Sequence, residues 1–210
     1  MLFTHMIRTA ALLGVFALIS TWLVAITFDV TEEPIAASEK QALLRNLHEL
    51  IPNAVHDNDL FSDVINVQNA DYLGVNKSQR VFRARMKGKP VALAIESVAP
   101  DGYSGNIFLL MAIRYDGSLL GVRVSKHKET PGLGDGIEIE RSNWIFGFNN
   151  KSLTNPNEKS WGVEKDGGAF DQFTGATITP RAIVKAVHRT LQYYQQHRDE
   201  LFADNIKREN

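Results

Sequence analysis

The chain of 210 residues contains no cysteine. This absence excludes disulfides, iron–sulfur ligation, thiolate zinc sites and haem attachment through CxxCH, because each of them needs a thiol. An excess of basic residues is also lacking, since 23 Lys and Arg stand against 24 Asp and Glu, for a formal net charge of -1. Binding of nucleic acid depends on clustered cations, so we expect no nucleic-acid partner.

The six histidines lack the spacing of a metal site. No two of them are three to five residues apart, and none stands beside a carboxylate cluster of metal-ligand form. We therefore expect no bound metal. Only His127 opens a segment of interest, and for it a structural hydrogen bond is favoured over proton transfer.

One long apolar run is present, near the N-terminus. Residues 9–28, TAALLGVFALISTWLVAITF, are uncharged and match the roughly 20 residues that a helix needs to cross a bilayer. The apolar core of a signal peptide is shorter, at about 7 to 15 residues, and no small-x-small cleavage site follows the run. The sequence therefore predicts a retained transmembrane helix over 9–28.

The charges that flank this run predict its orientation. Arg8 precedes it, whereas Asp29, Glu32 and Glu33 follow it. Positive residues favour the cytoplasmic side, so we expect residues 1–8 in the cytoplasm. Residues 29–210 would then form one periplasmic domain, anchored by a single pass in the inner membrane.

The remaining patterns predict an α+β domain. A helix is expected from Ser38, which with Gln41 resembles a capping box, to Pro52. Strand-like runs follow at 63–68, 80–86 and 90–99, and then 106–126 shows two strand-like halves around Asp116-Gly117, a strong hairpin signal. The expected fold is an antiparallel sheet with flanking helices.

Two details of this fold are also predicted. In the second half of the hairpin, Leu120, Val122 and Val124 alternate as one buried face should. Polar residues at 149–160 indicate an exposed loop.

The segment DQFTGATITP, residues 171–180, places three threonines just before the last predicted helix. Thr179 is expected at the N-cap and Pro180 in the first turn, where a missing N–H is harmless. Thr174 and Thr177 then lie in a Gly175-Ala176 turn near the free N–H groups of the helix, where an anion would be stable. Taken alone, however, the tetrad is most often an ordinary capped turn.

A longer stretch, DGGAFDQFTGATITPRAIV, resembles the flavinylation segment of the FMN-binding subunits of Rnf/Rsx electron-transport complexes and of sodium-pumping NADH:quinone reductases. The blocks APDGYSGNI at 99–107 and HKETPGLGDGIE at 127–138 look like the same family. The single anchor and the length are similar to those of its G subunits. The resemblance covers nearly the whole chain.

The resemblance implies a covalent cofactor and its site. FMN would be joined through its phosphate to Thr177, the last residue of the tetrad formed with Thr174, Gly175 and Ala176. A separate flavin transferase, acting on FAD with a divalent metal, would install it and would recognise Asp171. Thr130, Leu133 and Gly134 would lie beside the flavin ring. The glycines at 132, 134 and 136 do not complete the GxGxxG fingerprint of dinucleotide binding.

The resemblance also implies the function. The chain would be an electron-carrying, non-autonomous subunit of a membrane redox complex, in which other subunits couple electron transfer to ion translocation. Two alternatives from other classes remain open. One is an anchored extracytoplasmic binding or assembly module without a cofactor, and the other is a hydrolase that uses Ser104, His127 and a carboxylate.

Overall fold

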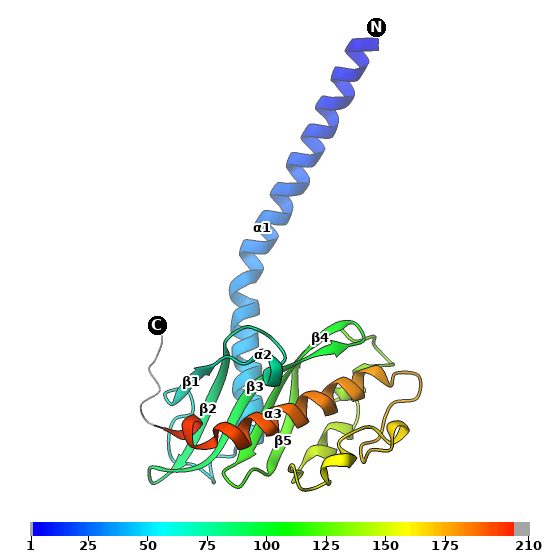
Figure 1. The fold of residues 1–210 in the computed structure, drawn as a ribbon. Coiled ribbons are helices and arrows are strands. Elements are labelled where there is room, and N and C mark those ends of the chain that lie inside the picture. The colour runs from blue at the N-terminus through cyan, green and yellow to red at the C-terminus, as the bar shows by residue number, and fades with distance from the viewer. Residues whose placement is uncertain (1, 204–210) are drawn as a thin grey trace. The chain divides into compact units, whose positions relative to one another are not determined.

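The structure is a computed structural model that describes residues 2–203 (Figure 1). The chain divides into two compact units, of which the first ends at Leu44 and the second begins at Arg45. The elements, in chain order, are α1 (Leu2–Leu50), β1 (Val64–Val67), α2 (Ala70–Leu73), β2 (Gln79–Met86), β3 (Lys89–Gly102), β4 (Gly105–Arg114), β5 (Leu119–Lys126) and α3 (Ile178–Phe202). This combination confirms the predicted α+β class.

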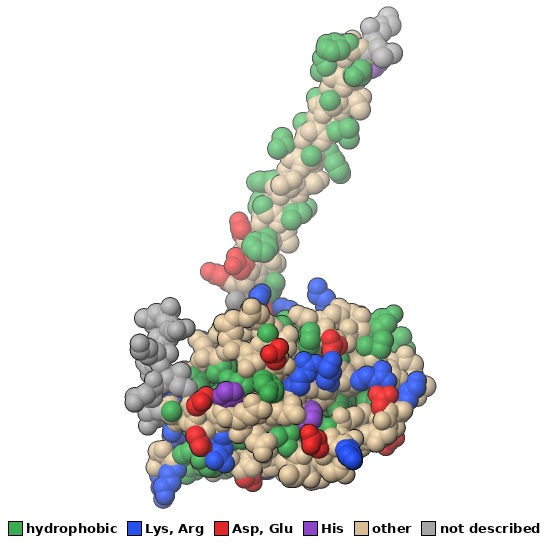
Figure 2. Space-filling view, in the orientation of Figure 1, with side chains coloured by type: hydrophobic (Ala, Val, Ile, Leu, Met, Phe, Trp, Pro, Cys, Tyr) green, Lys and Arg blue, Asp and Glu red, His purple; other side chains and the backbone are tan. Residues whose placement is uncertain are grey.

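Helix α1 is long and apolar on its surface. Its large hydrophobic side chains are exposed over most of its length, as the face in view in Figure 2 shows, and Trp22 is 65% exposed. The hydroxyl of Thr27 donates to the carbonyl of Leu23 at 2.8 Å, so this polar side chain is satisfied within the helix. Among residues 2–203, α1 is the one helix with the length and composition to cross a membrane. An apolar surface of this kind is stable in lipid and not in water.

The prediction of a separate helix beginning at Ser38 is wrong. Residues 29–37 are helical, and α1 continues through them without a break, even past Pro34. A capping box starts a helix only where the preceding chain leaves helical geometry, and no glycine interrupts this stretch. The predicted stop is confirmed, because α1 ends at Leu50, two residues before Pro52.

The five strands form one antiparallel sheet in the order β1-β2-β3-β4-β5. Consecutive strands pair throughout. The connection from β1 to β2 contains the short helix α2, and the later strands are joined by short turns. The hairpin predicted at Asp116-Gly117 joins β4 to β5, where Gly117 has a φ of 89° and the Asp116 carboxylate accepts from the Ser118 N–H at 2.8 Å. Asparagine or aspartate followed by glycine tolerates this backbone geometry.

The predicted alternation in β5 is interrupted by a bulge. In β4, Ile113 pairs with Leu119 and the residue before it, Ala112, pairs with Gly121. Leu120 therefore has no partner in β4 and is the extra residue of the bulge. As a result Leu119, and not Leu120, joins Val122 in the buried core. A bulge of this kind changes which residues share a face.

Helix α3 covers one face of the sheet, and the end of α1 covers part of the other. On the α3 side, Ile183, Val187 and Leu191 pack against alternate residues of the strands within one cluster. On the opposite face, Leu50 lies against Gly121, where an added Cβ would be 2.9 Å from the leucine Cδ2. Both faces of the central strands are therefore buried.

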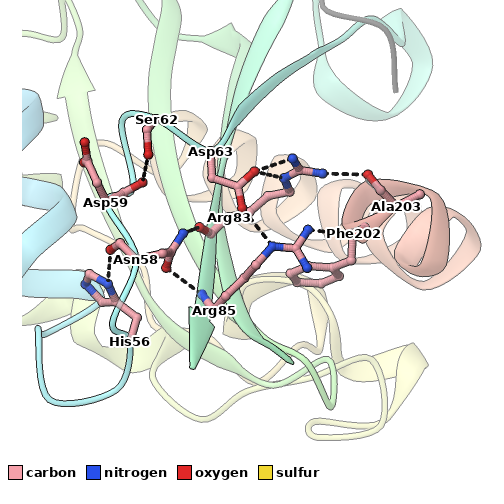
Figure 3. Close-up of polar contacts among 9 residues, drawn as sticks. All are labelled: His56, Asn58, Asp59, Ser62, Asp63, Arg83, Arg85, Phe202 and Ala203. Carbon is pink, nitrogen blue, oxygen red and sulfur yellow. Dashed lines mark hydrogen bonds and ion pairs between the residues drawn. The ribbon is translucent and has the colours of Figure 1, made fainter. Parts of the chain in front are cut away.

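A cluster of charges fixes the C-terminal end of α3 (Figure 3). Arg83 donates to the carbonyl of Ala203 at 2.7 Å and Arg85 to that of Phe202 at 2.9 Å. Asp63 accepts from both guanidinium groups, at 2.7 Å from Arg83 Nε and 2.8 Å from Arg85 Nε. The last carbonyls of a helix have no hydrogen-bond donors within the helix, and here the two arginines of β2 supply the donors. This attachment holds α3 across the sheet.

Between β5 and α3 the chain runs through 127–177 without a long strand or helix. Short 3-10 helices, such as η2 (Trp144–Phe148), and ring contacts among Trp144, Phe148, Phe170 and Trp161 give this segment its own packing. The predicted loop at 149–160 lies here and is confirmed. The two ends of this segment, 127–134 and 174–177, form the candidate site.

Candidate functional site

The tetrad begins as a tight turn. The Ala176 N–H donates to the carbonyl of Phe173 at 3.1 Å, and Gly175, the third residue of the turn, has a φ of 84°. Nothing lies within 4 Å of a Cβ added at Gly175, so it is the backbone conformation, and not a lack of space, that requires glycine. The turn leaves Thr174 and Gly175 exposed.

The base of this turn is held by Trp144. The indole N–H donates to the carbonyl of Asp171 at 2.8 Å, and the ring meets that of Phe173 edge to face at 5.4 Å. Phe173 also lies on Gly136, whose added Cβ would be 3.0 Å from the phenyl ring. The segment that precedes the tetrad is therefore fixed to the domain.

The prediction that Thr179 caps α3 is wrong. The helix begins at Ile178 with Thr177 in the N-cap position, and no side-chain hydrogen bond caps it there. The Thr179 hydroxyl instead donates to the carboxylate of Glu129, and Thr179 is buried. A local rule cannot reveal this competitor, since Glu129 is 50 residues away along the chain.

The first turn of α3 therefore keeps donors available. Within residues 2–203, no acceptor is bonded to the N–H groups of Ile178 and Thr179, and Pro180 has no N–H. Arg181, the cation of this turn, forms two hydrogen bonds with the carboxylate of Asp166, at 2.6 and 2.9 Å. These bonds lower the pKa of Asp166. Free N–H groups and the helix dipole favour an anion at this end.

The loop that faces the tetrad contains the predicted Pro131-Gly132 turn. The N–H groups of Leu133 and Gly134 donate to the carbonyl of Thr130 at 3.1 and 3.0 Å, and Gly132 has a φ of 78°. Proline at the second position and glycine at the third suit this turn. The turn brings Thr130, Leu133 and Gly134 next to one another.

A cavity of about 320 Å³ lies between this loop, the tetrad and the tip of the β3–β4 hairpin. This volume is at the lower end of ordinary ligand sites, which span roughly 300 to 1,000 Å³. Six of the predicted residues line it together, namely Thr130, Leu133, Gly134, Gly175, Ala176 and Thr177. The remaining lining residues are Tyr103, Glu129, Ile178 and Thr179.

The walls of the cavity are mostly apolar, and one buried carboxylate lies among them. Tyr103, Leu133 and Ile178 are large side chains that are 68, 53 and 45% exposed, so they form a rim that a bound group could cover. Glu129 is only 4% exposed, and its carboxylate accepts from the Ser104 N–H at 3.0 Å as well as from Thr179. It thereby ties the hairpin tip to α3.

Two of the predicted site residues lie outside this cavity. Thr174 lines a neighbouring, more open depression together with Gln172 and Phe173, and Leu133 separates the two hollows because it lines both. Asp171 is exposed, and its carboxylate accepts from the N–H of Gln172 at 2.7 Å.

His127 has the structural role that the sequence favoured. Its Nδ1 accepts from the Glu129 N–H at 3.0 Å, so Nε2 carries the proton and donates to Glu138 at 2.7 Å. Both ring nitrogens are thus engaged within the loop. A hydrolase would need one of them to accept the proton of Ser104, so the geometry argues against that alternative.

Four lining residues were not predicted for the site, namely Tyr103, Glu129, Ile178 and Thr179, the last of which was expected only as a helix cap. Tyr103 and Glu129 both stand in blocks that carry the family resemblance, and this was the available signal. Their roles depend on contacts between segments, which no spacing rule reveals.

Comparison with family models agrees with this geometry. Residues 102–192 match the FMN-binding domain, a span that contains every residue lining the cavity. Residues 1–50 match the RnfG N-terminal region, which coincides with α1.

Relatives match along nearly the whole chain. The G subunit of the ion-translocating oxidoreductase complex of Shewanella loihica is 49% identical over 195 residues, which is 93% of this chain and 92% of the relative. The corresponding protein of Vibrio cholerae is 48% identical and that of Aliivibrio fischeri 46%, with 92% and 94% of both chains covered. Similarity of this extent spans most of α1 as well as the sheet and the site.

Proposed function

Because the chain belongs to the G-subunit family of ion-translocating oxidoreductase complexes, we propose that it is an electron-carrying subunit whose FMN is joined through a phosphoester to Thr177. The observation that carries this proposal is the position of Thr177. Its side chain lines the cavity and forms no capping bond, so its hydroxyl is available for modification. Thr179 lines the same cavity, but its hydroxyl is engaged with Glu129.

The residues around Thr177 fit both ends of FMN. The free N–H groups of Ile178 and Thr179 and the dipole of α3 suit a phosphate. Tyr103, Leu133 and Ile178 offer apolar surface to a planar ring. FMN bound here would supply a carrier that accepts two electrons and releases them one at a time.

The charges of the cavity provide a reason for covalent attachment. Among the described residues, its lining contains a buried carboxylate, Glu129, and neither lysine nor arginine. A free phosphate would meet little attraction beyond that of the helix end, whereas a phosphoester bears less charge and cannot diffuse away. Tethering replaces binding from solution with an effective concentration of roughly millimolar or more.

The same proposal covers how FMN is attached and on which side of the membrane the domain lies. A flavin transferase would recognise the exposed Asp171 and transfer FMN to Thr177, after which the chain works with the other subunits of its complex. With α1 as the anchor, the domain that begins at Arg45 would lie on the periplasmic side. The flanking Arg8, Asp29, Glu32 and Glu33 support this orientation.

The test is the fluorescence of flavin on a denaturing gel. Full-length wild type, Thr177→Val, Thr174→Val and Thr179→Val would each be coexpressed with a flavin transferase in a host that exports both proteins. We expect flavin fluorescence that survives denaturation in all chains except Thr177→Val. Valine has the shape of threonine without its hydroxyl, so loss at Thr177 alone identifies the attachment point.

Two results would contradict the proposal. Fluorescence that persists in Thr177→Val would place the flavin elsewhere. A colourless wild type, correctly exported and folded, would instead favour an anchored binding or assembly module without a cofactor.

A further inference from the structure

Glu129 is a feature of the cavity that attachment at Thr177 does not require. It lies in the wall, and only 4% of it is exposed. Each of its carboxylate oxygens accepts a hydrogen bond, one from the Ser104 N–H and the other from the Thr179 hydroxyl. Two donors suit an ionised carboxylate, which has acceptors only.

The charge of Glu129 is not paired with a cation. Within residues 2–203, no lysine, arginine or histidine side chain forms an ion pair with it, and Arg181 of the neighbouring helix turn is bonded to Asp166. The other walls include the apolar side chains of Leu133 and Ile178. An unpaired charge in surroundings of low polarity acts over several ångströms with little screening.

We propose that Glu129 tunes the reduction potential of the flavin by placing a fixed negative charge beside it, an inference that rests on the proposed attachment at Thr177. Reduction of an oxidised flavin takes up two electrons together with one or two protons from water. Whenever electrons outnumber protons, the cavity gains negative charge, which Glu129 repels. The carboxylate therefore lowers the potential and makes the bound flavin a stronger donor to the next carrier.

A redox titration of the loaded protein tests this role. Wild type and Glu129→Gln, full length and carrying covalent flavin, would be purified in detergent and titrated with mediators while flavin absorbance is followed. Glutamine keeps the shape, because its amide can accept from Ser104 and donate to the Thr179 oxygen. We expect a more positive midpoint, so that the ratio of reduced to oxidised flavin rises about tenfold at the wild-type midpoint.

Two further variants separate charge from structure. Glu138 belongs to the same loop, but its carboxylate is hydrogen-bonded to His127 and does not line the cavity. The flavin midpoint of Glu138→Gln should therefore match that of the wild type. Glu129→Asp keeps the charge and should also stay close to the wild type, even if stability falls. Because this variant has its own expected result, the proposal stays testable if Glu129→Gln does not fold.

The outcomes are distinct from those of the proposed function. Attached flavin with an unchanged or more negative midpoint in Glu129→Gln would overturn this inference alone. So would a rise of equal size in Glu138→Gln or Glu129→Asp. If the wild type carries no covalent flavin on the denaturing gel, the proposed function and this inference fail together.

Discussion

Gly134 shows how tightly single residues are fitted around the candidate site. A Cβ added there would be 3.0 Å from both Cβ and Oε2 of Glu129 and 3.2 Å from the hydroxyl oxygen of Thr179. A Cβ at this position would press on both partners of the hydrogen bond between Glu129 and Thr179. The φ of Gly134 is -97°, which any residue can adopt. Glycine is therefore needed here for the close approach of its neighbours and not for its backbone conformation.

We therefore expect Gly134→Ala to destabilise the domain by about 1 to 3 kcal/mol, as overpacking of a close contact does. Unfolding of the full-length protein in detergent, with urea and tryptophan fluorescence, would measure this. Gly147→Ala is the matched control, because nothing lies within 4 Å of a Cβ added there. Equal stability of Gly134→Ala and the control would contradict the close contact.

For single residues, the sequence predicted which segments meet but not every role. Six of the residues expected from the resemblance line one cavity. Thr179 was misassigned, because the pattern of threonine followed by proline satisfied the local rule for a cap while the true partner, Glu129, was remote. Local rules describe the start of a helix, but a buried acceptor from another segment can override them.

Helix α3 connects the site to the rest of the domain, and it carries a group sensitive to pH. The ring of His188 stacks on Trp161 at 5.1 Å, and its Nε2 is buried without a hydrogen-bond partner within the described residues. Loss of solvation lowers the pKa of His188 below its usual 6.5, against a smaller opposing effect of Glu158. The folded chain therefore binds this proton less readily than the unfolded chain.

The stability that depends on neutral His188 is fully present above pH 6.5, the pKa of the unfolded chain, and is lost progressively as pH falls from there through the lower pKa of the folded chain. We expect the urea midpoint of the wild type to fall between about pH 7.5 and about pH 5.5 more steeply than that of His188→Phe, which keeps a ring on Trp161. Asp101 and Asp116, whose pKa values are lowered below 3.8, act only at more acidic pH. Parallel pH profiles of the two proteins would contradict the assignment.

Among the helices and strands, the sequence predicted the strands and α3 but not the continuity of α1 or the bulge in β5. The strands are marked by short β-branched and apolar runs, and Asp116-Gly117 is a distinct turn signal between two of them. By contrast, Ser38 resembles the start of a helix although the chain before it is already helical. Leu120 gives no local sign that it is the extra residue of a bulge, because a bulge depends on the partner strand.

For the protein as a whole, the main expectation is that the domain lies outside the cytoplasm. A C-terminal fusion to alkaline phosphatase, which is active only after export, should be active, and the same fusion to a green fluorescent protein that fails to mature outside should be dark. Replacing Arg8 by Gln and both Glu32 and Glu33 by Arg should reduce the phosphatase activity, since positive residues favour the cytoplasmic side. A bright fluorescent fusion of the unmodified chain would contradict the predicted orientation.

Attachment of FMN to Thr177, on which the proposed electron transfer depends, can be located by fragmentation mass spectrometry. The wild type coexpressed with a flavin transferase would be digested with trypsin, and the peptide of residues 166–181, between Lys165 and the cleavage after Arg181, would be sequenced. This peptide contains all three threonines of the segment. We predict the added mass of FMN, less one water, on Thr177 alone. The added mass on Thr174 or Thr179, or an unmodified peptide throughout, would contradict attachment at Thr177.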